Sequence, residues 1–157
     1  MPKAKVLDSS AKVPGTDGEK MSKSYDNFIE VFEEVKPARK KIMRISTDSR
    51  PLEDAKDPDT DHLYQLFSLF AEDSAREEMA AMYRKGGFGY GDVKKALADA
   101  SENYFGPARE RRAKLESSPN EVLQILSAGA KKARAKAAEV LHRAQDACGL
   151  RHSKSTA

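Results

Sequence analysis

The stretch Leu63-Tyr64-Gln65-Leu66-Phe67-Ser68-Leu69-Phe70 decides the fold class, because its apolar residues recur with the period of an α-helix. The spacing i, i+3, i+4, i+7 places four of them on one face of a helix. These four are Leu63, Leu66, Phe67 and Phe70. Upstream, Asp57-Pro58-Asp59-Thr60 has the residue types of a turn and a helix cap. The stretch therefore predicts an amphipathic helix beginning just after residue 60.

Helical patterns continue downstream of this stretch. Ser74 with Glu77 predicts a capping box at the start of a second helix. An apolar stripe over residues 93–108 predicts a third, which Gly106-Pro107 should kink or interrupt. The glycine-rich run of residues 86–91 follows no strand and precedes no Lys-Ser/Thr pair, so it predicts a tight inter-helix loop rather than a phosphate cradle.

The two ends of the chain add further helices. Ser118-Pro119-Asn120-Glu121 combines a hydroxyl cap with proline at the first helical position, and Gly149 should end the helix that starts there. Its first apolar residues, over 122–126, should pack inward. Apolar residues over 28–35 predict a helix capped by Asp26 or Asn27, and Pro37 fits the first turn of another. Because alternating-period strands are nearly absent, we expect a mainly α protein, with a helical bundle from about residue 60 onward.

Composition excludes several classes of protein. The chain has 157 residues, of which 39% are hydrophobic and 34% charged, and no tryptophan. No apolar run approaches the roughly 18 residues of a membrane span, and the N-terminus has no apolar segment typical of a signal peptide. A single cysteine, Cys148, cannot form an internal disulfide, and no Cys/His cluster is present. We therefore expect a reducing compartment, no structural metal and no membrane contact.

Charge is distributed unevenly along the chain. Lysine and arginine exceed aspartate and glutamate in residues 1–45 and again in residues 101–157, whereas residues 46–100 are acidic. Two basic ends suit a protein that contacts an anion at two places, such as a nucleotide and an RNA backbone. The alternative is that these side chains only solvate helix faces.

The run Glu19-Lys20-Met21-Ser22-Lys23-Ser24 is a compact cluster of cationic and hydroxyl donors. Gly15 and Gly18 precede it, so the segment reads as a mobile loop rather than a helix. Such a loop could fold over a polyphosphate and bring ammonium groups to developing negative charge. A solvated turn is the alternative reading.

This run contains KMSKS in full, the signature loop of class I aminoacyl-tRNA synthetases. The wider segment Val13-Pro14-Gly15-Thr16-Asp17-Gly18-Glu19-Lys20-Met21-Ser22-Lys23-Ser24-Tyr25-Asp26-Asn27 resembles bacterial tryptophanyl-tRNA synthetases closely. The resemblance extends from about Val13 to Leu150. It includes Lys40-Lys41-Ile42-Met43, Thr47-Asp48-Ser49, Asp54-Ala55-Lys56-Asp57-Pro58-Asp59, the segment from Tyr83 to Tyr90, and Ala130-Lys131-Lys132-Ala133-Arg134.

The resemblance implies a function. The family uses ATP, with Mg²⁺ carried by the nucleotide, to make tryptophanyl adenylate, and then transfers tryptophan to tRNA(Trp). It implies a Rossmann domain followed by a helical domain, in a cytoplasmic homodimer. Lys20 and Lys23 carry over as catalytic residues. The implied ATP-binding residues are Val13, Lys20, Met21, Ser22, Lys23 and Ser24, with Met21 packing the loop against the body of the protein.

Candidates for tRNA contact rest on position alone. They are the basic residues Arg109, Arg111, Arg112, Lys131, Lys132 and Arg134. A solvated helix face is the alternative for each.

One motif of the family is missing. Class I synthetases carry an H-x-G-H motif, and the three histidines, His62, His142 and His152, do not form one. The chain therefore resembles the C-terminal half of the family. Residues 1–45 correspond to the end of the catalytic domain with its KMSKS loop, 46–150 to a helical anticodon-binding-type domain and 151–157 to a flexible tail. We expect no tryptophan activation by this chain alone, because the Rossmann half that holds tryptophan is absent. A stand-alone tRNA-binding helical module and a nonfunctional truncated paralogue are the alternatives.

Overall fold

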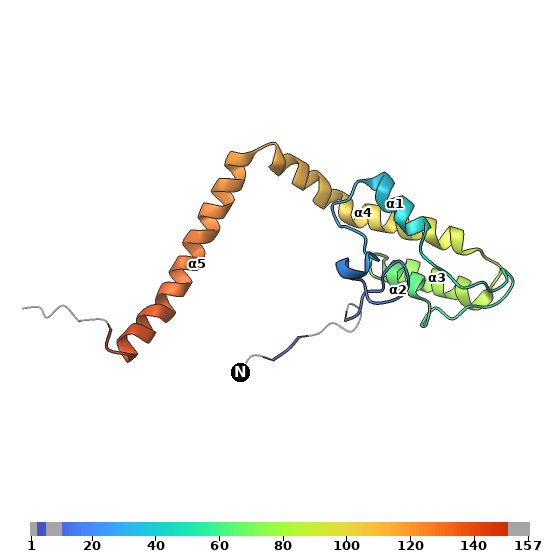
Figure 1. The fold of residues 1–157 in the computed structure, drawn as a ribbon, viewed down its shortest axis with the longest axis horizontal. Helices are drawn as coiled ribbons and strands as arrows, with labels where there is room; N and C mark the ends of the chain where they lie inside the picture. Colours follow the sequence, from blue (N-terminus) through green and yellow to red (C-terminus); the bar gives the residue numbers. More distant parts are fainter. Residues whose placement is uncertain (1–2, 6–10, 151–157) are drawn as a thin grey trace, which may run out of the picture. The chain divides into compact units, whose positions relative to one another are not determined.

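A computed structural model describes residues 3–5 and 11–150 of the chain (Figure 1). Within these residues the protein is helical, and its β-structure is limited to an isolated antiparallel bridge between Pro14 and Lys20. The elements are η2 (Lys23–Tyr25), α1 (Val35–Met43), α2 (His62–Ser68), α3 (Asp73–Lys85), α4 (Tyr90–Glu116) and α5 (Pro119–Ala147). The predicted mainly α class is confirmed, whereas the predicted tail from residue 151 lies outside the described part.

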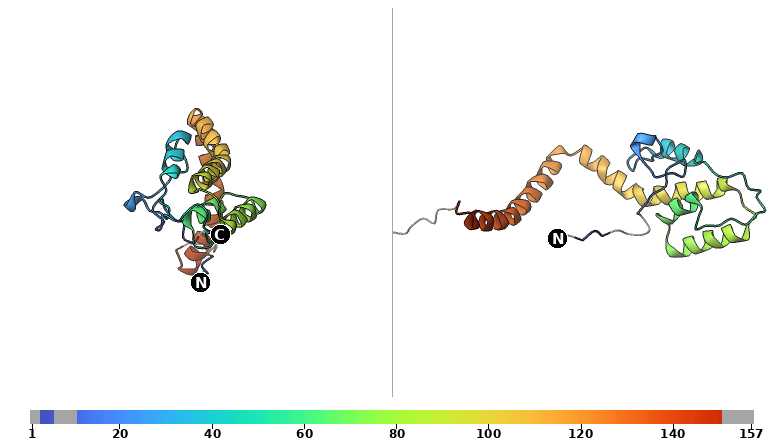
Figure 2. Two further views of the ribbon diagram at one scale, coloured as in Figure 1. Left: turned by 90° about the vertical axis from the view of Figure 1, so that its right-hand side faces the viewer. Right: turned by 60° about the horizontal axis from the view of Figure 1, so that its bottom comes forward.

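The chain divides into two compact units, Met1–Arg109 and Glu110–Ala157, and α4 runs through the boundary. The first unit contains a single apolar core, to which the loop before α1 and the helices α1 to α4 contribute. Figure 2 shows α1 to α4 from two further sides. The buried core residues are Ile42, Ile45, Leu63, Leu66, Phe67, Tyr83, Phe88, Val93, Leu97 and Ala98. Each large side chain buried in this way contributes about 1.5–3 kcal/mol.

Helix α2 begins at the cap that Asp61 provides. The Asp61 carboxylate accepts hydrogen bonds from the backbone N–H of Leu63 and of Tyr64, at 2.9 and 3.0 Å. It also accepts one from the Tyr83 hydroxyl of α3 at 3.2 Å. Burial, together with this negative neighbour, raises the pKa of Tyr83. The predicted amphipathic helix is confirmed, and its cap links α2 to α3.

Helices α1 and α4 are joined by charged groups at the surface of the first unit. The Arg39 guanidinium lies 2.6 Å from the Asp99 carboxylate. The Lys94 ammonium donates to the Met43 carbonyl at 3.5 Å, and partial burial lowers the pKa of Lys94. Exposed pairs of this kind add little stability, so the apolar core is the main link between the helices.

Three sequence predictions for the first unit are wrong. Residues 28–34 form no helix, because the Asn27 amide is engaged in the preceding loop instead of capping one. Helix α3 begins at Asp73, and its N-cap, Glu72, makes no side-chain capping bond, so Ser74 lies inside the helix. Pro107 lies inside α4, so the predicted interruption of this helix is wrong, whereas a kink at Pro107 stays a prediction. The carbonyl that proline leaves unpaired belongs to Asn103, an exposed residue that water can reach.

In the second unit, α5 begins with Pro119 in its first turn, as predicted. Ser118 makes no side-chain capping bond, contrary to the predicted hydroxyl cap. The helix stops before Gly149, which has φ +67°. The backbone N–H of Leu150 then donates to the Gln145 carbonyl at 2.8 Å, which closes the last turn.

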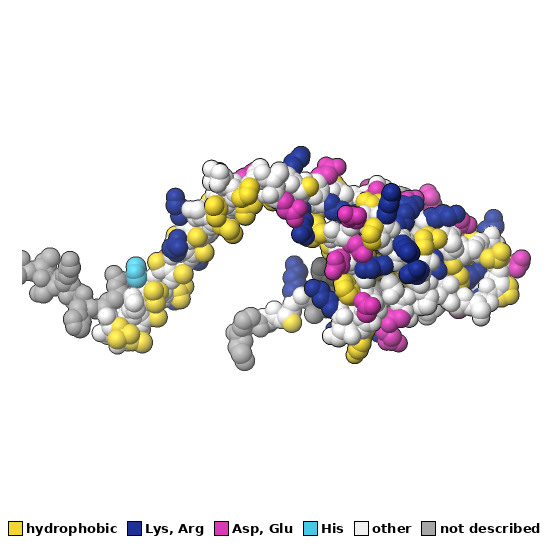
Figure 3. Space-filling view, turned by 45° about the horizontal axis from the view of Figure 1, so that its top comes forward, with side chains coloured by type: hydrophobic (Ala, Val, Ile, Leu, Met, Phe, Trp, Pro, Cys, Tyr) yellow, Lys and Arg dark blue, Asp and Glu magenta, His cyan; other side chains and the backbone are white. Residues whose placement is uncertain are grey.

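No residue of α5 is buried, so the prediction that its first apolar residues pack inward is wrong. Leu123 and Leu126 are each 63% exposed. Figure 3 shows hydrophobic side chains along this helix. None of the described helices is both long and apolar enough to cross a membrane.

Candidate active-site loop

The loop that carries the KMSKS residues folds back on itself between Val13 and Met21. The N–H of Met21 donates to the Val13 carbonyl at 2.8 Å, beside the bridge from Pro14 to Lys20. Across the turn, the N–H of Gly15 donates to the Glu19 carbonyl at 2.6 Å. Gly18 has φ +86°, a conformation that residues with a side chain rarely adopt. This part of the predicted loop is thus a turn closed by backbone hydrogen bonds, and its mobility stays a prediction.

A second turn completes the motif. Ser22 is the N-cap of η2, and its hydroxyl oxygen accepts from the N–H of Ser24 at 3.2 Å. Asp26 ends the turn with φ +52°, and its N–H donates to the Lys23 carbonyl at 3.2 Å. This turn holds Lys23 and Ser24 on its outer side, where both are exposed.

Asn27 lies at the centre of the two turns and is only 2% exposed. Its Oδ1 accepts from the N–H of Ser22 at 2.7 Å. Its Nδ2 donates to the Asp17 carboxylate at 2.8 Å and to the Lys20 carbonyl at 3.1 Å. A Cβ at position 15 would lie 2.4 Å from Nδ2, so only glycine leaves room for this amide.

Asp17 joins the same network from the first turn. Its carboxylate also accepts from the N–H of Glu19 at 3.0 Å. The hydrogen bond from Asn27 is the main cause that lowers the pKa of Asp17, so this carboxylate is ionised at neutral pH. Sequence reasoning treated Asn27 as a helix cap and missed this network.

The loop is attached to the body of the first unit by one backbone bond and several apolar contacts. The N–H of Ser46 donates to the Thr16 carbonyl at 2.9 Å, and the His62 ring nitrogen Nε2 lies 2.7 Å from the Ser46 carbonyl. Val13 and Met21 pack against the core, so the predicted packing role of Met21 is confirmed. His62 therefore supports the loop from the start of α2.

The side chains of Lys20 and Lys23 are exposed. Among the described residues, neither ammonium group has a hydrogen-bond or salt-bridge partner. Ser24 is also exposed, and Ser22 is half-buried. Within the described part of the chain, the loop thus offers two ammonium groups without a partner and two hydroxyls, and these donors are chemically suited to the oxygens of a polyphosphate. Groups of three or more His, Cys, Asp and Glu side chains that could hold a metal ion are absent from the described residues.

The basic residues considered for tRNA contact belong to both units. The Arg109 guanidinium belongs to the first unit and donates to the Val31 carbonyl at 3.0 Å. In the second unit, Arg112 pairs with Glu116 at 2.7 Å. The others are exposed, Arg111 on α4, and Lys131, Lys132 and Arg134 on α5.

Two other segments noted in the sequence have structural contacts. The Asp48 carboxylate accepts from the Tyr90 hydroxyl at 2.9 Å and from Arg50 at 2.5 Å. Burial and the hydrogen bond to Asp48 raise the pKa of Tyr90. At Asp48, desolvation alone would raise the pKa, but the hydrogen bonds from Tyr90 and Arg50 outweigh it and lower the pKa. Lys56 is 3% exposed, and its ammonium donates to the carbonyls of residues 51, 52 and 54 and lies 4.4 Å from the Phe88 ring centroid. These contacts shape the 46–60 loop.

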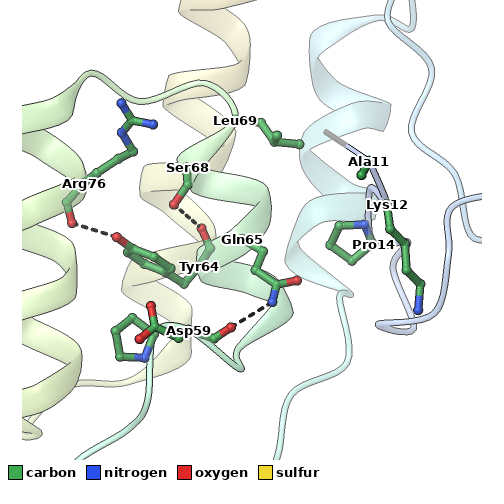
Figure 4. Close-up of a pocket in the computed structure, with 10 residues that line it drawn as sticks. Ala11, Lys12, Pro14, Asp59, Tyr64, Gln65, Ser68, Leu69 and Arg76 are labelled. Atoms are coloured by element: carbon green, nitrogen blue, oxygen red, sulfur yellow. Dashed lines mark hydrogen bonds between the residues drawn. The ribbon is translucent and has the colours of Figure 1, made fainter. Parts of the chain in front are cut away.

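A polar groove of about 600 Å³ lies beside the loop, between residues 11–14 and the helices α2 and α3 (Figure 4). Its polar groups are largely paired with each other. The Tyr64 hydroxyl donates to the Arg76 carbonyl, Gln65 donates to the Asp59 carbonyl, and the Ser68 hydroxyl donates to the Tyr64 carbonyl. The Tyr64, Gln65 and Ser68 side chains are therefore already paired within the groove.

Comparison with known proteins identifies the family. The family model described as tRNA synthetases class I (W and Y) matches residues 3–106. The chain belongs to this family of class I tRNA synthetases.

Individual relatives are similar along nearly the whole chain. It is 62% identical over 151 residues to a tryptophan–tRNA ligase of Rhodopirellula baltica, covering 96% of this chain and 47% of that protein. It is 42% identical to a tryptophan–tRNA ligase of Fusobacterium nucleatum, with coverage of 96% and 46%. The crystal structure of Campylobacter jejuni tryptophanyl-tRNA synthetase, complexed with ADP and tryptophan, superposes with a TM-score of 0.77 at 40% identity. That match covers 94% of this chain and 46% of the other. The chain thus spans about half the length of these relatives.

Proposed function

We propose that this chain acts in tryptophan–tRNA ligation as the C-terminal part of a tryptophan-activating enzyme. In this proposal, residues 1–45 are the end of the catalytic domain and residues 46–150 the helical anticodon-binding-type domain. Lys20 and Lys23 stabilise the ATP phosphates during adenylate formation. Val13, Met21, Ser22 and Ser24 complete the nucleotide loop, and Mg²⁺ arrives with ATP.

One observation carries the proposal: the ammonium groups of Lys20 and Lys23, which have no partner among the described residues, are displayed on a loop whose backbone is fixed by hydrogen bonds. When a carboxylate attacks the α-phosphorus of ATP, negative charge builds on the departing pyrophosphate. Cations that meet this charge only during the reaction bind the transition state more tightly than the ground state. Removing one such donor typically lowers the rate by roughly 100- to 1,000-fold.

The chain requires a second part for this activity. The H-x-G-H motif is absent from residues 1–157, and the relatives are about twice as long. The tryptophan pocket and the remaining nucleotide contacts would come from a Rossmann half. We also infer that the complete enzyme is a cytoplasmic homodimer that transfers tryptophan to tRNA(Trp).

The test is tryptophan-dependent ATP–pyrophosphate exchange. The chain is assayed alone and mixed with the separately expressed N-terminal half of the Rhodopirellula baltica relative. We expect no exchange from the chain alone and exchange on mixing. Lys20→Ala and Lys23→Ala should each lower exchange in the mixture by about 100-fold or more. Lys36→Ala, a change at an exposed lysine outside the loop, is the matched control and should leave exchange unchanged.

A tRNA-binding module without catalysis is the second candidate, because Lys131, Lys132 and Arg134 are exposed on one helix. Phosphate-directed binding weakens steeply with salt. Binding of tRNA by the chain alone that is salt-sensitive and indifferent to ATP, with no exchange in the mixture, would favour this candidate. A chain that neither binds nor reconstitutes would instead be a nonfunctional remnant.

A further inference from the structure

We propose that Asn27 is a positioning residue that fixes the direction of the two loop lysines, with Asp17 as its support. The inference rests on the proposed function of the loop in ATP-phosphate binding. Asn27 itself is buried, so it acts through the backbone of the residues that would contact the nucleotide.

The geometry places Asn27 between the two lysines. It holds the Lys20 carbonyl on one side and the Ser22 N–H on the other, at 3.1 and 2.7 Å. Ser22 in turn caps η2, the turn from which Lys23 projects. A single amide group therefore determines the backbone path on both sides of Met21. The separation of the two ammonium groups depends on that path.

An amide is the only common side chain that satisfies this arrangement. Oδ1 accepts one bond, and the two hydrogens of Nδ2 are donated to the Lys20 carbonyl and the Asp17 carboxylate. Aspartate at position 27 could accept from Ser22 but could donate nothing, and it would place a second carboxylate against Asp17. Alanine would leave the Ser22 N–H and the Lys20 carbonyl without this partner in a half-buried loop.

A loop backbone that is already ordered before ATP binds should raise the rate of the reaction. Donors that already point to where charge develops need no rearrangement during the reaction, and this is the source of their catalytic effect. Without the Asn27 bonds, the backbone positions from which the two lysines project would vary. The main loss should therefore appear in kcat rather than in the KM for ATP.

The first test uses the chain alone and needs no activity. Amide hydrogen exchange is followed by NMR at Ser22, whose N–H is bonded to Asn27, and at Ile45 in the core as a reference. We expect Asn27→Ala to speed exchange at Ser22 by roughly threefold to tenfold, the effect of losing one hydrogen bond. Exchange at Ile45 should not change. Equal Ser22 exchange in the wild type and the variant would overturn the proposal.

A second pair of variants covers the case in which Asn27→Ala fails to fold. Asp17 is exposed, so Asp17→Ala should leave the core intact. We expect this variant also to speed exchange at Ser22, because Asn27 loses its support. Asp17→Asn keeps an oxygen that can accept from Nδ2 and should restore slow exchange. No change in Asp17→Ala would contradict the proposed support.

The second test measures the energetic coupling between Asn27 and the loop lysines, using ATP–pyrophosphate exchange by the reconstituted mixture. If Asn27 acts through Lys20 and Lys23, Asn27→Ala should lower kcat by a larger factor in the wild-type background than in a Lys20→Ala background, where Lys23 alone remains to be positioned. A purely structural role would lower activity by the same factor in both backgrounds and would refute the proposal. A mixture without any ATP–pyrophosphate exchange would refute the proposed function. Amide hydrogen exchange at Ser22 would still decide the role of Asn27.

Discussion

Truncation of Leu63 to alanine tests whether the first unit is held together by the core described above. Leu63 is completely buried where α2 meets the other helices. Replacing such a leucine with alanine removes buried apolar surface and leaves a cavity, which together cost about 3 kcal/mol or more. For a unit of this size, the melting temperature should fall by roughly 12 °C or more.

The matched control is the same substitution on α5. Leu123 is 63% exposed, so Leu123→Ala removes little buried surface, and alanine favours a helix. We expect a change of no more than about 0.5 kcal/mol. The pair thus separates the effect of burial from the effect of the substitution itself.

Near-UV circular dichroism is a suitable assay because the chain has five tyrosines and no tryptophan. All five tyrosines precede residue 110, so this signal reports the first unit alone. Far-UV circular dichroism, which reports the helices of both units, is recorded in parallel so that an effect of Leu123→Ala on α5 is also detected. Thermal unfolding is compared for the wild type, Leu63→Ala and Leu123→Ala. A loss below about 1 kcal/mol for Leu63→Ala would refute the described core. If Leu123→Ala lowers the free energy of unfolding as much as Leu63→Ala does, the exposure of Leu123 on α5 is refuted.

Three further outcomes can be measured by the same unfolding assay or by amide hydrogen exchange. Asp61→Ala should cost about 1–3 kcal/mol, because α2 loses its cap and the Tyr83 hydroxyl its acceptor, whereas Asp61→Asn should cost less. Lys56→Met should cost about 2 kcal/mol by leaving three carbonyls without their donor, and Lys36→Met, at an exposed lysine, should have almost no effect. Because the folded pKa of Asp17 lies below the usual 3.8, the charge-assisted part of its stabilising bond is complete above that pH and is lost as pH falls through the folded value, which leaves a weaker neutral hydrogen bond. Ser22 exchange, corrected for intrinsic rates, should therefore stay constant from pH 8 to about pH 5 and rise in stronger acid.

Much of the helical fold could be predicted from apolar spacing and from proline. The i, i+3, i+4, i+7 pattern at Leu63 to Phe70 found α2, although the helix ends at Ser68 and Phe70 packs from beyond it. Pro119 marked the start of α5. Patterns fail where another contact competes: the same spacing over residues 28–35 produces no helix before residue 35, because the Asn27 amide is engaged in the loop instead of capping one.

The candidate loop was found because its donors are consecutive in the sequence. Its internal support was not found, since Asn27 contacts residues five, seven and ten positions earlier, and no helical or strand period connects them. An asparagine after Asp26 also fits a helix cap, which competed with the correct reading. The useful signal was Gly15, whose missing side chain marks a close approach of another group.

The contacts of Gly15 with Asn27 leave position 15 without freedom to vary. A Cβ there would lie 2.4 Å from Nδ2 and 2.6 Å from the backbone oxygen of Asn27. In a library randomised at position 15 alone, only glycine should survive selection. Shortening residue 27 in the same clone would remove the clash with the amide but not the clash with the backbone oxygen. A second-site change at position 27 should therefore not release position 15 from glycine.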